Sequence, residues 1–492
     1  MSSMMSVAAV RNAEYEAMTA GRSEFSLMLA AGQQAADIIH YHYPDALRFI
    51  VLCGGGNNGG DALVAAQRLF QRYRREVVIY CVKPLNTLKG CAAQAAEMVV
   101  PEVRCFDAEQ LEKSDIYPGD VIIDGLLGIG FDGGALRSNI KRIIETVNGV
   151  RNPVVALDLP SGMNGDTGKI SPDGAVKAEL TVTFGAVKPG LFSPEGSRCR
   201  GILRVADIGL PAADSLKEEV FTNIDAVKML SVPESDCHKN SRGRVLIWGG
   251  SETYPGAPVL TASGALHSGC GIVRLVSCGN CRELAPAAVI VKKIPNGSDV
   301  KRDVLPFFSL SDVLVAGCGW GNETPFDAFD AVFEFPGKVI LDADALNMVS
   351  ARVQMWRRRE DVLITPHPGE AARLAAAFGI EAGCRRELAA NLAKVMGCIV
   401  LLKGRDSIAA APDGRMTLVG AGNHALATAG SGDVLAGIIA AQSAALPLFE
   451  AAALGAYIHG AAGETARKII TADQLPDAAG KVINSLRNNF LF

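Results

Sequence analysis

Short apolar runs rich in β-branched residues alternate with Ala- and Leu-rich helical patterns along nearly all of the 492 residues. Each run is continuous rather than alternating in polarity, as expected for parallel strands that helices cover on both faces. This alternation predicts α/β sheets of three layers with right-handed crossovers. The 52 glycines fit the tight strand-to-helix turns that such folds repeat.

The same pattern occupies both halves of the chain. In the first half we expect strands at residues 49–53, 77–82, 121–124, 154–158 and 180–184. Helices are expected within 10–41 and at 61–72 and 138–148. In the second half we expect strands at 245–248, 272–276, 313–316, 339–342, 362–365 and 399–403, and a strongly apolar helix that begins near Asp433.

A chain of this length exceeds one ordinary core, so two or more domains are expected. The strand–helix pattern is interrupted around 208–221, where Gly209-Leu210-Pro211 is followed by the polar run 214–219. We therefore predict a first domain at residues 1–218 and a second at 222–492.

Charge and cysteine usage exclude several classes of protein. A net charge of -4 disfavours a nucleic-acid surface. The twelve cysteines show no zinc-like spacing, which fits unpaired thiols in a reducing compartment. The charged N-terminal residues do not resemble a signal peptide, and polar residues interrupt the apolar stretch 434–463. We expect a cytoplasmic protein with no membrane span.

Glycine-rich turns and aspartates follow predicted strands in the first half. The strand at 49–53 leads into Gly-Gly-Gly-Asn-Asn-Gly-Gly-Asp at 54–61. Such glycines let the backbone approach a phosphate or ribose, and the following helix offers N–H donors. Asp124 and Asp158 each end a strand. Ligands of open α/β sheets bind beyond these strand ends, so one site is predicted there, although each turn alone could be structural.

Three segments resemble the NAD(P)H-hydrate epimerase family: Asn-Asn-Gly-Gly-Asp at 57–61, Asp-Gly-Leu-Leu-Gly-Ile-Gly at 124–130 and Leu-Asp-Leu-Pro-Ser-Gly at 157–162. The resemblance spans most of residues 10–215 and implies a Rossmann-like domain. It implies a potassium ion on Asn58, Asp124 and Ser161. Epimerisation needs a group that moves a proton, and Asp158 is the candidate catalyst. The implied hydrate contacts are Asn57, Asn58, Gly59, Gly60, Asp61, Gly128, Ile129, Gly130, Phe131, Asp132, Gly133, Gly134 and Asp158.

The second half carries the sharpest motif of the chain. Small residues at 427–432 lead directly into an apolar helix with Asp433 in its first turn. Backbone N–H groups of residues 430–433 would form an anion hole for a transferring phosphoryl group, and Asp433 would deprotonate the attacking hydroxyl. The alternative is an aspartate that only stabilises a helix N-terminus. Lys403, after another strand, suits the neutralisation of nucleotide phosphates.

With Gly249-Gly250-Ser251 and Tyr254-Pro255-Gly256-Ala257-Pro258, these motifs resemble the ADP-dependent NAD(P)H-hydrate dehydratase family of the ribokinase superfamily. The resemblance covers roughly residues 225–492 and implies a ribokinase-like domain that uses ADP and magnesium. The implied hydrate contacts are Ala257, Gly319, His367 and Asp433. The implied nucleotide contacts are Lys403, Gly404, Arg405, Asp406, Ser407, Gly430, Ser431 and Gly432.

The two resemblances together predict a bifunctional enzyme of nicotinamide nucleotide repair. It would interconvert the R and S forms of hydrated NADH and NADPH, and dehydrate the S form with ADP to give NAD(P)H, AMP and phosphate. Two alternatives stay open: a ribokinase-like kinase of a small vitamin or sugar with an accessory N-terminal domain, and a first domain that only binds a ligand. We expect small-molecule partners and a homo-oligomer.

Overall fold

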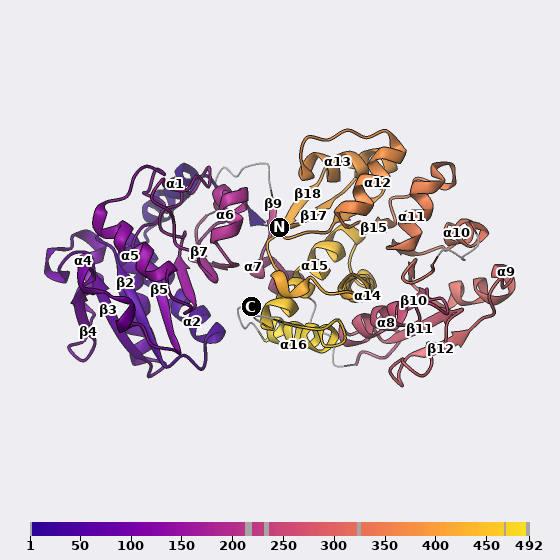
Figure 1. Ribbon diagram of the computed structural model, residues 1–492, viewed down its shortest axis with the longest axis horizontal. Coiled ribbons are helices and arrows are strands. Elements are labelled where there is room, and N and C mark those ends of the chain that lie inside the picture. Colours follow the sequence, from indigo (N-terminus) through magenta and orange to yellow (C-terminus); the bar gives the residue numbers. More distant parts are fainter. Residues whose placement is uncertain (1, 212–218, 231–235, 322–325, 467–468, 489–492) are drawn as a thin grey trace. The chain divides into compact units, whose positions relative to one another are not determined.

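The structure is a computed structural model that describes residues 2–211, 219–230, 236–321, 326–466 and 469–488. The chain divides into two compact units, Ser2–Ile224 and a second that begins at Asp225 (Figure 1). Most of the polar run that marked the predicted boundary, residues 214–218, lies outside the described residues. The limits of the two functional domains therefore stay predictions.

The first unit contains a seven-stranded sheet of order β4-β3-β2-β5-β6-β7-β8, and all its neighbouring strands are parallel. Its strands are β2 (Arg48–Cys53), β3 (Glu76–Cys81), β4 (Arg104–Asp107), β5 (Asp120–Gly125), β6 (Val154–Leu157), β7 (Leu180–Phe184) and β8 (Ile202–Ala206). A short strand β1 (Ser2–Ser3) pairs antiparallel with β9 (Glu219–Phe221). The helices are α1 (Val7–Thr19), α2 (Glu24–His42), α3 (Asn57–Gln71), α4 (Gly90–Glu97), α5 (Ser138–Asn148) and α6 (Pro194–Cys199).

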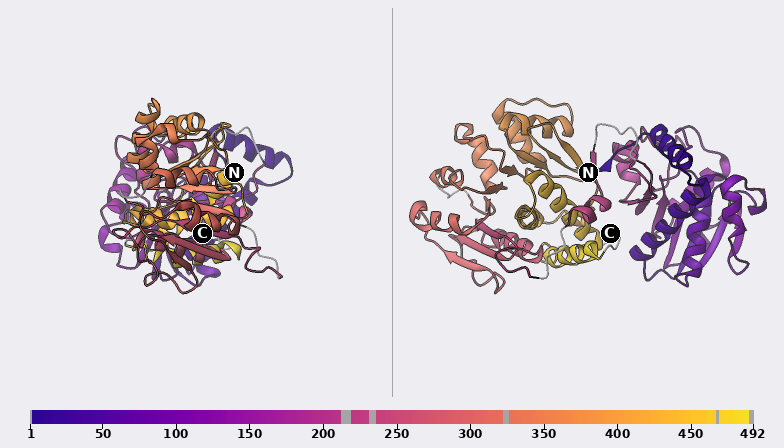
Figure 2. Two further views of the ribbon diagram at one scale, coloured as in Figure 1. Left: turned by 90° about the vertical axis from the view of Figure 1, so that its right-hand side faces the viewer. Right: turned by 180° about the vertical axis from the view of Figure 1, so that it is seen from behind.

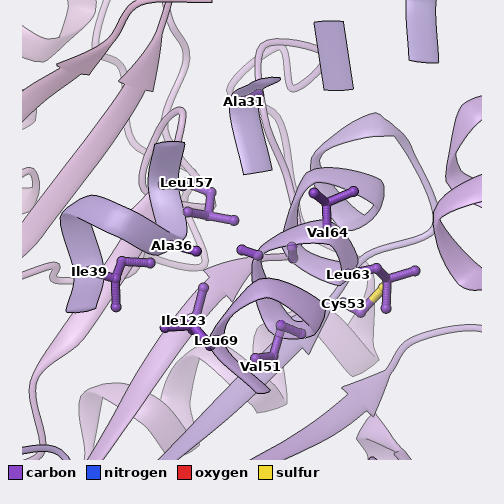
Figure 3. Close-up of a cluster of buried hydrophobic side chains, with 14 of the residues drawn as sticks. Ala31, Ala36, Ile39, Val51, Cys53, Leu63, Val64, Leu69, Ile123 and Leu157 are labelled. Atoms are coloured by element: carbon purple, nitrogen blue, oxygen red, sulfur yellow. The ribbon is translucent and has the colours of Figure 1, made fainter. Parts of the chain in front are cut away.

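The two faces of this sheet bury different side chains. Val51 and Ile123 belong to a core that includes Ile39 of α2 and Leu63 of α3 (Figure 3). The intervening Ile50 and Ile122 belong to a second core, which contains the apolar side chains of α5. Because successive strand residues point to opposite faces, the helices must cover both, and the predicted three layers are confirmed.

The helix α3 starts earlier than the pattern predicts. We expected a loop through Asp61, but the helix begins at Asn57. Close packing explains this: a β-carbon on Gly59 would lie 2.1 Å from the carbonyl oxygen of Gly54, and one on Gly60 would lie 2.6 Å from Met28 Sδ. These glycines allow the first turn to approach the end of β2, which outweighs their poor helix propensity.

The second unit contains a mixed sheet. From β18 onward, the order of its strands is β18-β17-β16-β15-β14-β13-β10-β11-β12. Neighbours are parallel from β16 to β12, and β16, β17 and β18 form an antiparallel meander that the sequence analysis missed. The strands are β10 (Arg244–Trp248), β11 (Ile272–Ser277), β12 (Ile290–Lys293), β13 (Val313–Ala316), β14 (Lys338–Leu341), β15 (Val362–Ile364), β16 (Ile399–Leu402), β17 (Ser407–Ala410) and β18 (Met416–Val419).

Helices pack closely in this unit, as the yellow segments of Figure 2 illustrate. A β-carbon on Gly437 of α14 would lie 2.0 Å from the carbonyl oxygen of Thr261 in α8, so glycine permits this contact. The helices are α7 (Asn223–Met229), α8 (Gly256–His267), α9 (Val300–Asp303), α10 (Phe326–Val332), α11 (Asp344–Ala351), α12 (Pro368–Phe378), α13 (Arg385–Met396), α14 (Ser431–Ser443), α15 (Leu448–Thr465) and α16 (Leu475–Arg487).

The α/β class and all predicted strands are confirmed, each within one residue at either end. Seven of the described strands were not predicted: β1, β4, β8, β9, β12, β17 and β18. Of these, β4 is exposed throughout, so it lacks the buried apolar run on which the prediction depends. Among the described helices, none combines the length and apolarity needed to cross a membrane.

Candidate active sites

A cavity of about 830 Å³ lies beyond the carboxyl ends of β2, β5, β6 and β7 in the first unit. The glycine-rich turn 54–56 and the loop 126–132 supply much of its wall. Helix α1 contributes Val10, Arg11 and Glu14. The parallel strands thus bring several turns, far apart in the sequence, to one edge of the sheet.

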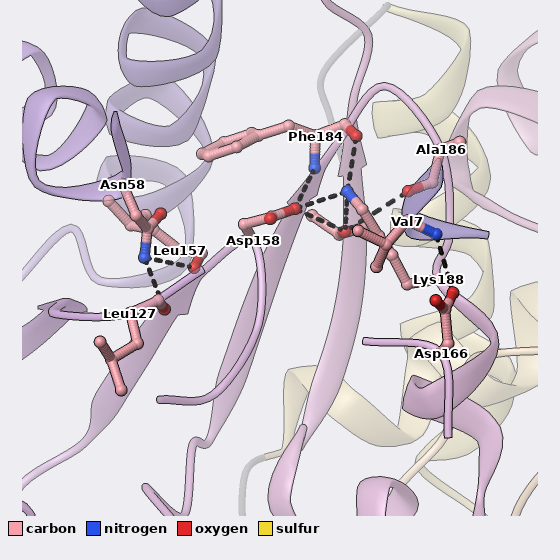
Figure 4. Close-up of polar contacts among 10 residues, drawn as sticks. Val7, Asn58, Leu127, Leu157, Asp158, Asp166, Phe184, Ala186 and Lys188 are labelled. Carbon is pink, nitrogen blue, oxygen red and sulfur yellow. Dashed lines mark hydrogen bonds and ion pairs between the residues drawn. The ribbon is translucent and has the colours of Figure 1, made fainter. Parts of the chain in front are cut away.

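Asp158 follows β6 directly and lines this cavity. Its φ is 63°, a conformation that costs about 1–3 kcal/mol for a residue other than glycine and persists where the surrounding structure enforces it. Here the Asp158 amide donates to the carbonyl oxygen of Val182 at 2.7 Å. The carboxylate accepts a hydrogen bond from Lys188 Nζ at 2.5 Å (Figure 4). A strained, buried carboxylate facing a cavity marks a functional position.

Three further carboxyl groups line the same cavity: Asp61 on α3, Glu14 on α1 and Asp132 in the loop 126–132. Burial raises the pKa of Asp61 well above its usual value, and the negative charges of Asp158 and Glu14 add to the rise. Burial also raises the pKa of Glu14, although the Lys188 ammonium opposes it. The site therefore places a carboxyl group with a raised pKa near a carboxylate that is paired with lysine.

Asn58, Asp124 and Ser161 form a polar cluster around Leu127. Ser161 donates to Asp124 through its hydroxyl at 2.6 Å and its amide at 2.8 Å. Asn58 Nδ2 donates to the carbonyl oxygens of Leu127 and Leu157 at 2.9 and 3.2 Å, whereas Asn58 Oδ1 is buried and has no hydrogen-bond partner among the described residues. Burial raises the pKa of Asp124 to about 6, against the hydrogen bonds from Ser161. Such oxygen donors suit a hard cation.

In the second unit, the helix α14 presents its N-terminus after Gly430, which takes a φ of 87°. The N–H groups of the first helical turn lack intrahelical acceptors, and together with the helix dipole they suit an anion. Asp433 lies in this turn and is half-buried rather than enclosed.

Three charged groups meet at this helix N-terminus. Burial, then the negative charge of Asp342, raises the pKa of Asp433 to about 7, against a hydrogen bond from Cys318 and the charge of Lys403. Lys403 Nζ donates to Asp342 Oδ1 at 2.7 Å. A β-carbon on Gly432 would lie 3.3 Å from that Nζ. A carboxyl with a pKa near neutrality, beside a buried lysine, suits a general base.

His367 has a structural role as well as a place near this site. It is the N-cap of α12, where its Nδ1 accepts from the Gly369 amide at 3.0 Å while Glu370 accepts from the His367 amide at 2.8 Å. Burial and the charges of Lys403 and Arg373 lower the pKa of His367. The imidazole is therefore held neutral and oriented by the helix that it caps.

Two protein-family models match the chain. The model described as NAD(P)H-hydrate dehydratase matches residues 245–485, and the model described as YjeF-related protein N-terminus matches residues 24–190. The bifunctional NAD(P)H-hydrate repair enzyme Nnr of Escherichia coli K12 is 33% identical over 464 residues, which cover 92% of this chain and 88% of the relative. The protein of the same name from Coxiella burnetii is 33% identical over 469 residues, with 93% of each chain covered.

The chain belongs to the bifunctional NAD(P)H-hydrate repair enzyme family. A further member, from Moorella thermoacetica, is 34% identical over 470 residues, which cover 90% of this chain and 88% of that protein. Among solved structures, the ADP/ATP-dependent NAD(P)H-hydrate dehydratase from Bacillus subtilis, co-crystallised with ATP and Mg²⁺, has a TM-score of 0.46 and 27% identity, and covers 55% of this chain and 100% of that one. The resemblance drawn from the sequence motifs is confirmed.

Within the repair-enzyme fold, most of the predicted epimerase contacts gather at the first cavity. Those that line it are Asn57, Asn58, Asp61, Gly128, Ile129, Gly130, Phe131, Asp132 and Asp158. Gly59 and Gly60 instead face the end of β2 and Met28, and Gly133 approaches Asn164. Gly134 follows Gly133 in the loop and donates to Asp132 at 2.9 Å. The predicted cation ligands Asp124 and Ser161 lie behind the lining, where both contact the loop residues 126–127.

Apart from His367, the predicted dehydratase residues fall into three groups. Gly319 and Ala257 approach each other, because a β-carbon on Gly319 would lie 3.0 Å from Ala257 Cβ. Lys403, Gly430, Ser431, Gly432 and Asp433 gather at the N-terminus of α14. Gly404, Arg405 and Asp406 form the turn from β16 to β17, and Ser407 begins β17.

The sequence analysis missed several residues that the fold brings to these sites. Lys188 lies four residues beyond β7, and the strand-end rule applied to β7 would have found it. His459 of α15 contacts Ser431 Oγ through Nε2 at 3.0 Å, and burial lowers its pKa to about 4. No local pattern marks His459, since it lies within an apolar helix.

Proposed function

We propose that the two units divide the repair of hydrated NADH and NADPH between them. The first domain, residues 1–218, interconverts the R and S epimers of the hydrate. The second, residues 222–492, dehydrates the S epimer with ADP to give NAD(P)H, AMP and phosphate. The membership of the chain in the bifunctional family supports this division. The partners are these small molecules, and we place the enzyme in the cytoplasm as a homo-oligomer.

In the first site, Asp158 is the acid–base catalyst. It takes the proton of the ring hydroxyl as the bond between the hydrated carbon and the ring nitrogen breaks, which leaves a planar carbonyl carbon and an electron pair on the nitrogen. The nitrogen then bonds to the opposite face of that carbon, and Asp158 returns the proton to the oxygen. The loop residues 128–132 and the turn at 54–58 hold the dinucleotide against this carboxylate. Proton transfer by a placed carboxylate contributes roughly 10²–10⁴-fold to such a rate. The positive φ and cavity position of Asp158 support this role.

A potassium ion fits the polar cluster of the first unit. Asn58 Oδ1, Asp124 and Ser161 Oγ would hold it, and the unpartnered buried oxygen of Asn58 is the observation that favours a cation there. When bound, the ion supplies positive charge beneath the loop that faces the substrate. The surrounding residues of the chain hold this loop in place and exclude water from the cluster.

In the second site, Asp433 removes the proton from the ring hydroxyl, and the hydroxyl oxygen attacks the terminal phosphorus of ADP. The bond from that phosphorus to the bridging oxygen breaks, so AMP leaves. The C–O bond of the new phosphate ester then breaks, the neighbouring carbon loses a proton, and the ring double bond is restored. The N–H groups of residues 430–433 stabilise the phosphoryl oxygens. Magnesium, bound to the nucleotide, would supply further charge neutralisation.

The observation that carries the second assignment is the position of Asp433: half-buried, in the first turn of α14, with Lys403 and Gly432 beside it. Lys403 is placed to neutralise nucleotide phosphate while its partner Asp342 keeps it charged. Asp342 and Glu370 raise the pKa of Lys403 against the effect of burial.

The test supplies each hydrate epimer separately, with and without ADP and magnesium, and follows the ultraviolet absorbance of the reduced nicotinamide. We expect the S epimer to be consumed only with nucleotide, and the R epimer to be consumed through the S form. Parallel reactions with ATP decide the nucleotide, and replacement of potassium by lithium should slow only epimerisation. A stable phosphorylated product, with no free phosphate, would instead indicate a kinase.

A further inference from the structure

We propose that Lys188 is a positioning residue of the epimerase site, which orients the carboxylate of Asp158 and balances its charge. The inference rests on the proposed epimerisation and adds a residue that acts through the catalyst. Lys188 is 1% exposed and borders the cavity, so its burial serves the site rather than the surface.

The Lys188 ammonium has a protein acceptor for each of its hydrogens. It donates to Asp158 Oδ1 at 2.5 Å, to the Phe184 carbonyl oxygen at 2.9 Å and to Thr183 Oγ1 at 3.2 Å (Figure 4). An ammonium group has three donors and no acceptor. No donor is left for a substrate, so Lys188 acts through Asp158 and not by direct contact.

These contacts select one oxygen of the carboxylate. Within the described residues, the hydrogen bonds to the Asp158 side chain all end on Oδ1: from Lys188, from Thr183 Oγ1 at 3.3 Å and from the Phe184 amide at 3.5 Å. Oδ2 faces the loop across the cavity, 3.6 Å from the position of a β-carbon on Gly128. Lys188 therefore fixes the oxygen that faces away and leaves Oδ2 directed at the substrate.

Residues at the N-terminal end of the first unit hydrogen-bond to the backbone next to Lys188. Met5 donates from its amide to the carbonyl oxygen of Val187 at 3.0 Å, and Met4 forms a β-bridge with Val187. The Val7 amide, at the start of α1, donates to Asp166 Oδ1 at 2.7 Å (Figure 4). The segment before α1 thus keeps the Lys188 side chain from moving out of the cavity wall.

The charges around Asp158 explain why a cation is needed. Asp61 from α3 and Glu14 from α1 face the same carboxylate, and Arg11 of α1 also lines the cavity. Like charges so close repel one another, and Lys188 is the cation in direct contact with Asp158. Without Lys188 the carboxylate would lose this attraction and its fixed orientation.

The test compares Lys188→Met with wild-type full-length enzyme. We expect kcat for epimerisation to fall roughly 10–100-fold, the scale on which an outer partner of an active-site group acts, with KM nearly unchanged. Dehydration of the S epimer should keep its wild-type rate. Lys177→Met, an exposed lysine of the same unit, is the matched control and should change neither activity.

If thermal unfolding shows that the first unit of Lys188→Met does not fold, Thr183→Val takes its place in the test. It removes one acceptor of the ammonium, and should lower kcat less, again with KM nearly unchanged. Lys188→Arg, which keeps the charge, should recover part of the activity. The proposal is overturned if folded Lys188→Met, or in its place Thr183→Val, retains the wild-type kcat. A wild-type enzyme with no epimerase activity would instead refute the proposed function.

Discussion

Asp158 and Asp433 hold their carboxylates at the two sites by different means. Asp158 is 6% exposed and is oriented by Lys188 and by a backbone with positive φ. Asp433 is half-buried and lies beside Asp342, whose negative charge adds to the effect of burial on its pKa. The first is a fixed, paired carboxylate, and the second is a carboxyl group whose pKa burial and Asp342 raise to about 7.

Replacement of either carboxylate by its amide should abolish one activity only. We expect Asp433→Asn to lower dehydration roughly 10²–10⁴-fold, because an amide cannot accept the hydroxyl proton, and to leave epimerisation unchanged. Asp158→Asn should show the reverse, so each variant is the folding control of the other. Rates measured with separate epimers check this, and a joint loss of both activities in either variant would contradict it.

The pKa of Asp433 predicts the pH dependence of dehydration. A base must be ionised, and burial together with Asp342 raises this pKa to about 7, so the active fraction falls as pH drops through that value. Below it, kcat/KM should fall about tenfold for each pH unit, as for a single titrating base. Profiles at saturating nucleotide measure this. An acid limb near the ordinary value of 3.8 would show that another group is the base.

At the scale of elements, glycines decide how closely the helices that carry site residues approach their neighbours. The first turn of α3 packs onto the end of β2 through Gly59, and α14 packs onto α8 through Gly437. Both helices begin with residues of a candidate site, so these contacts set the positions of Asn58 and Asp433. The packing of each helix against its neighbour therefore fixes where the site residues of that helix lie.

Gly59→Ala should therefore disturb the first unit. Its β-carbon would lie 2.1 Å from the Gly54 carbonyl oxygen, so backbone must shift, at a cost of about 1–3 kcal/mol. We expect a lower melting temperature of the first unit and slower epimerisation. Gly56→Ala is the matched control for stability, because a β-carbon there meets no atom within 4 Å. Equal stability of the two variants would contradict the packing argument.

At the scale of the whole molecule, each unit carries a candidate site of its own. The cavity of the first unit is lined by residues of that unit, and the group around Asp433 comes from the second. In the proposed division, chemistry links the two sites only through the S epimer, which the first would form and the second would consume. Fusion keeps the two activities in equal amounts without requiring a shared site.

Two inactive variants should therefore complement each other in solution. Asp158→Asn retains dehydration and Asp433→Asn retains epimerisation, so their mixture should convert R hydrate fully to NAD(P)H, whereas each alone should not. The S epimer diffuses between molecules, and no contact between the two chains is required. Conversion of R hydrate by the mixture, measured by nicotinamide absorbance, checks this. A mixture no better than the separate variants would mean that the epimer passes only within one chain.

The sequence by itself determined eleven of the strands, the two-part organisation and the motif residues, because short apolar runs and glycine-rich turns are local signals. It also placed Asp158 and Asp433 at element ends. Only the tertiary structure decided which side chains meet them. Lys188 reaches Asp158, and Lys403 and Asp342 approach Asp433, from elements distant in the chain. Burial and charge act through space, so the pKa of a base depends on neighbours that no local pattern identifies.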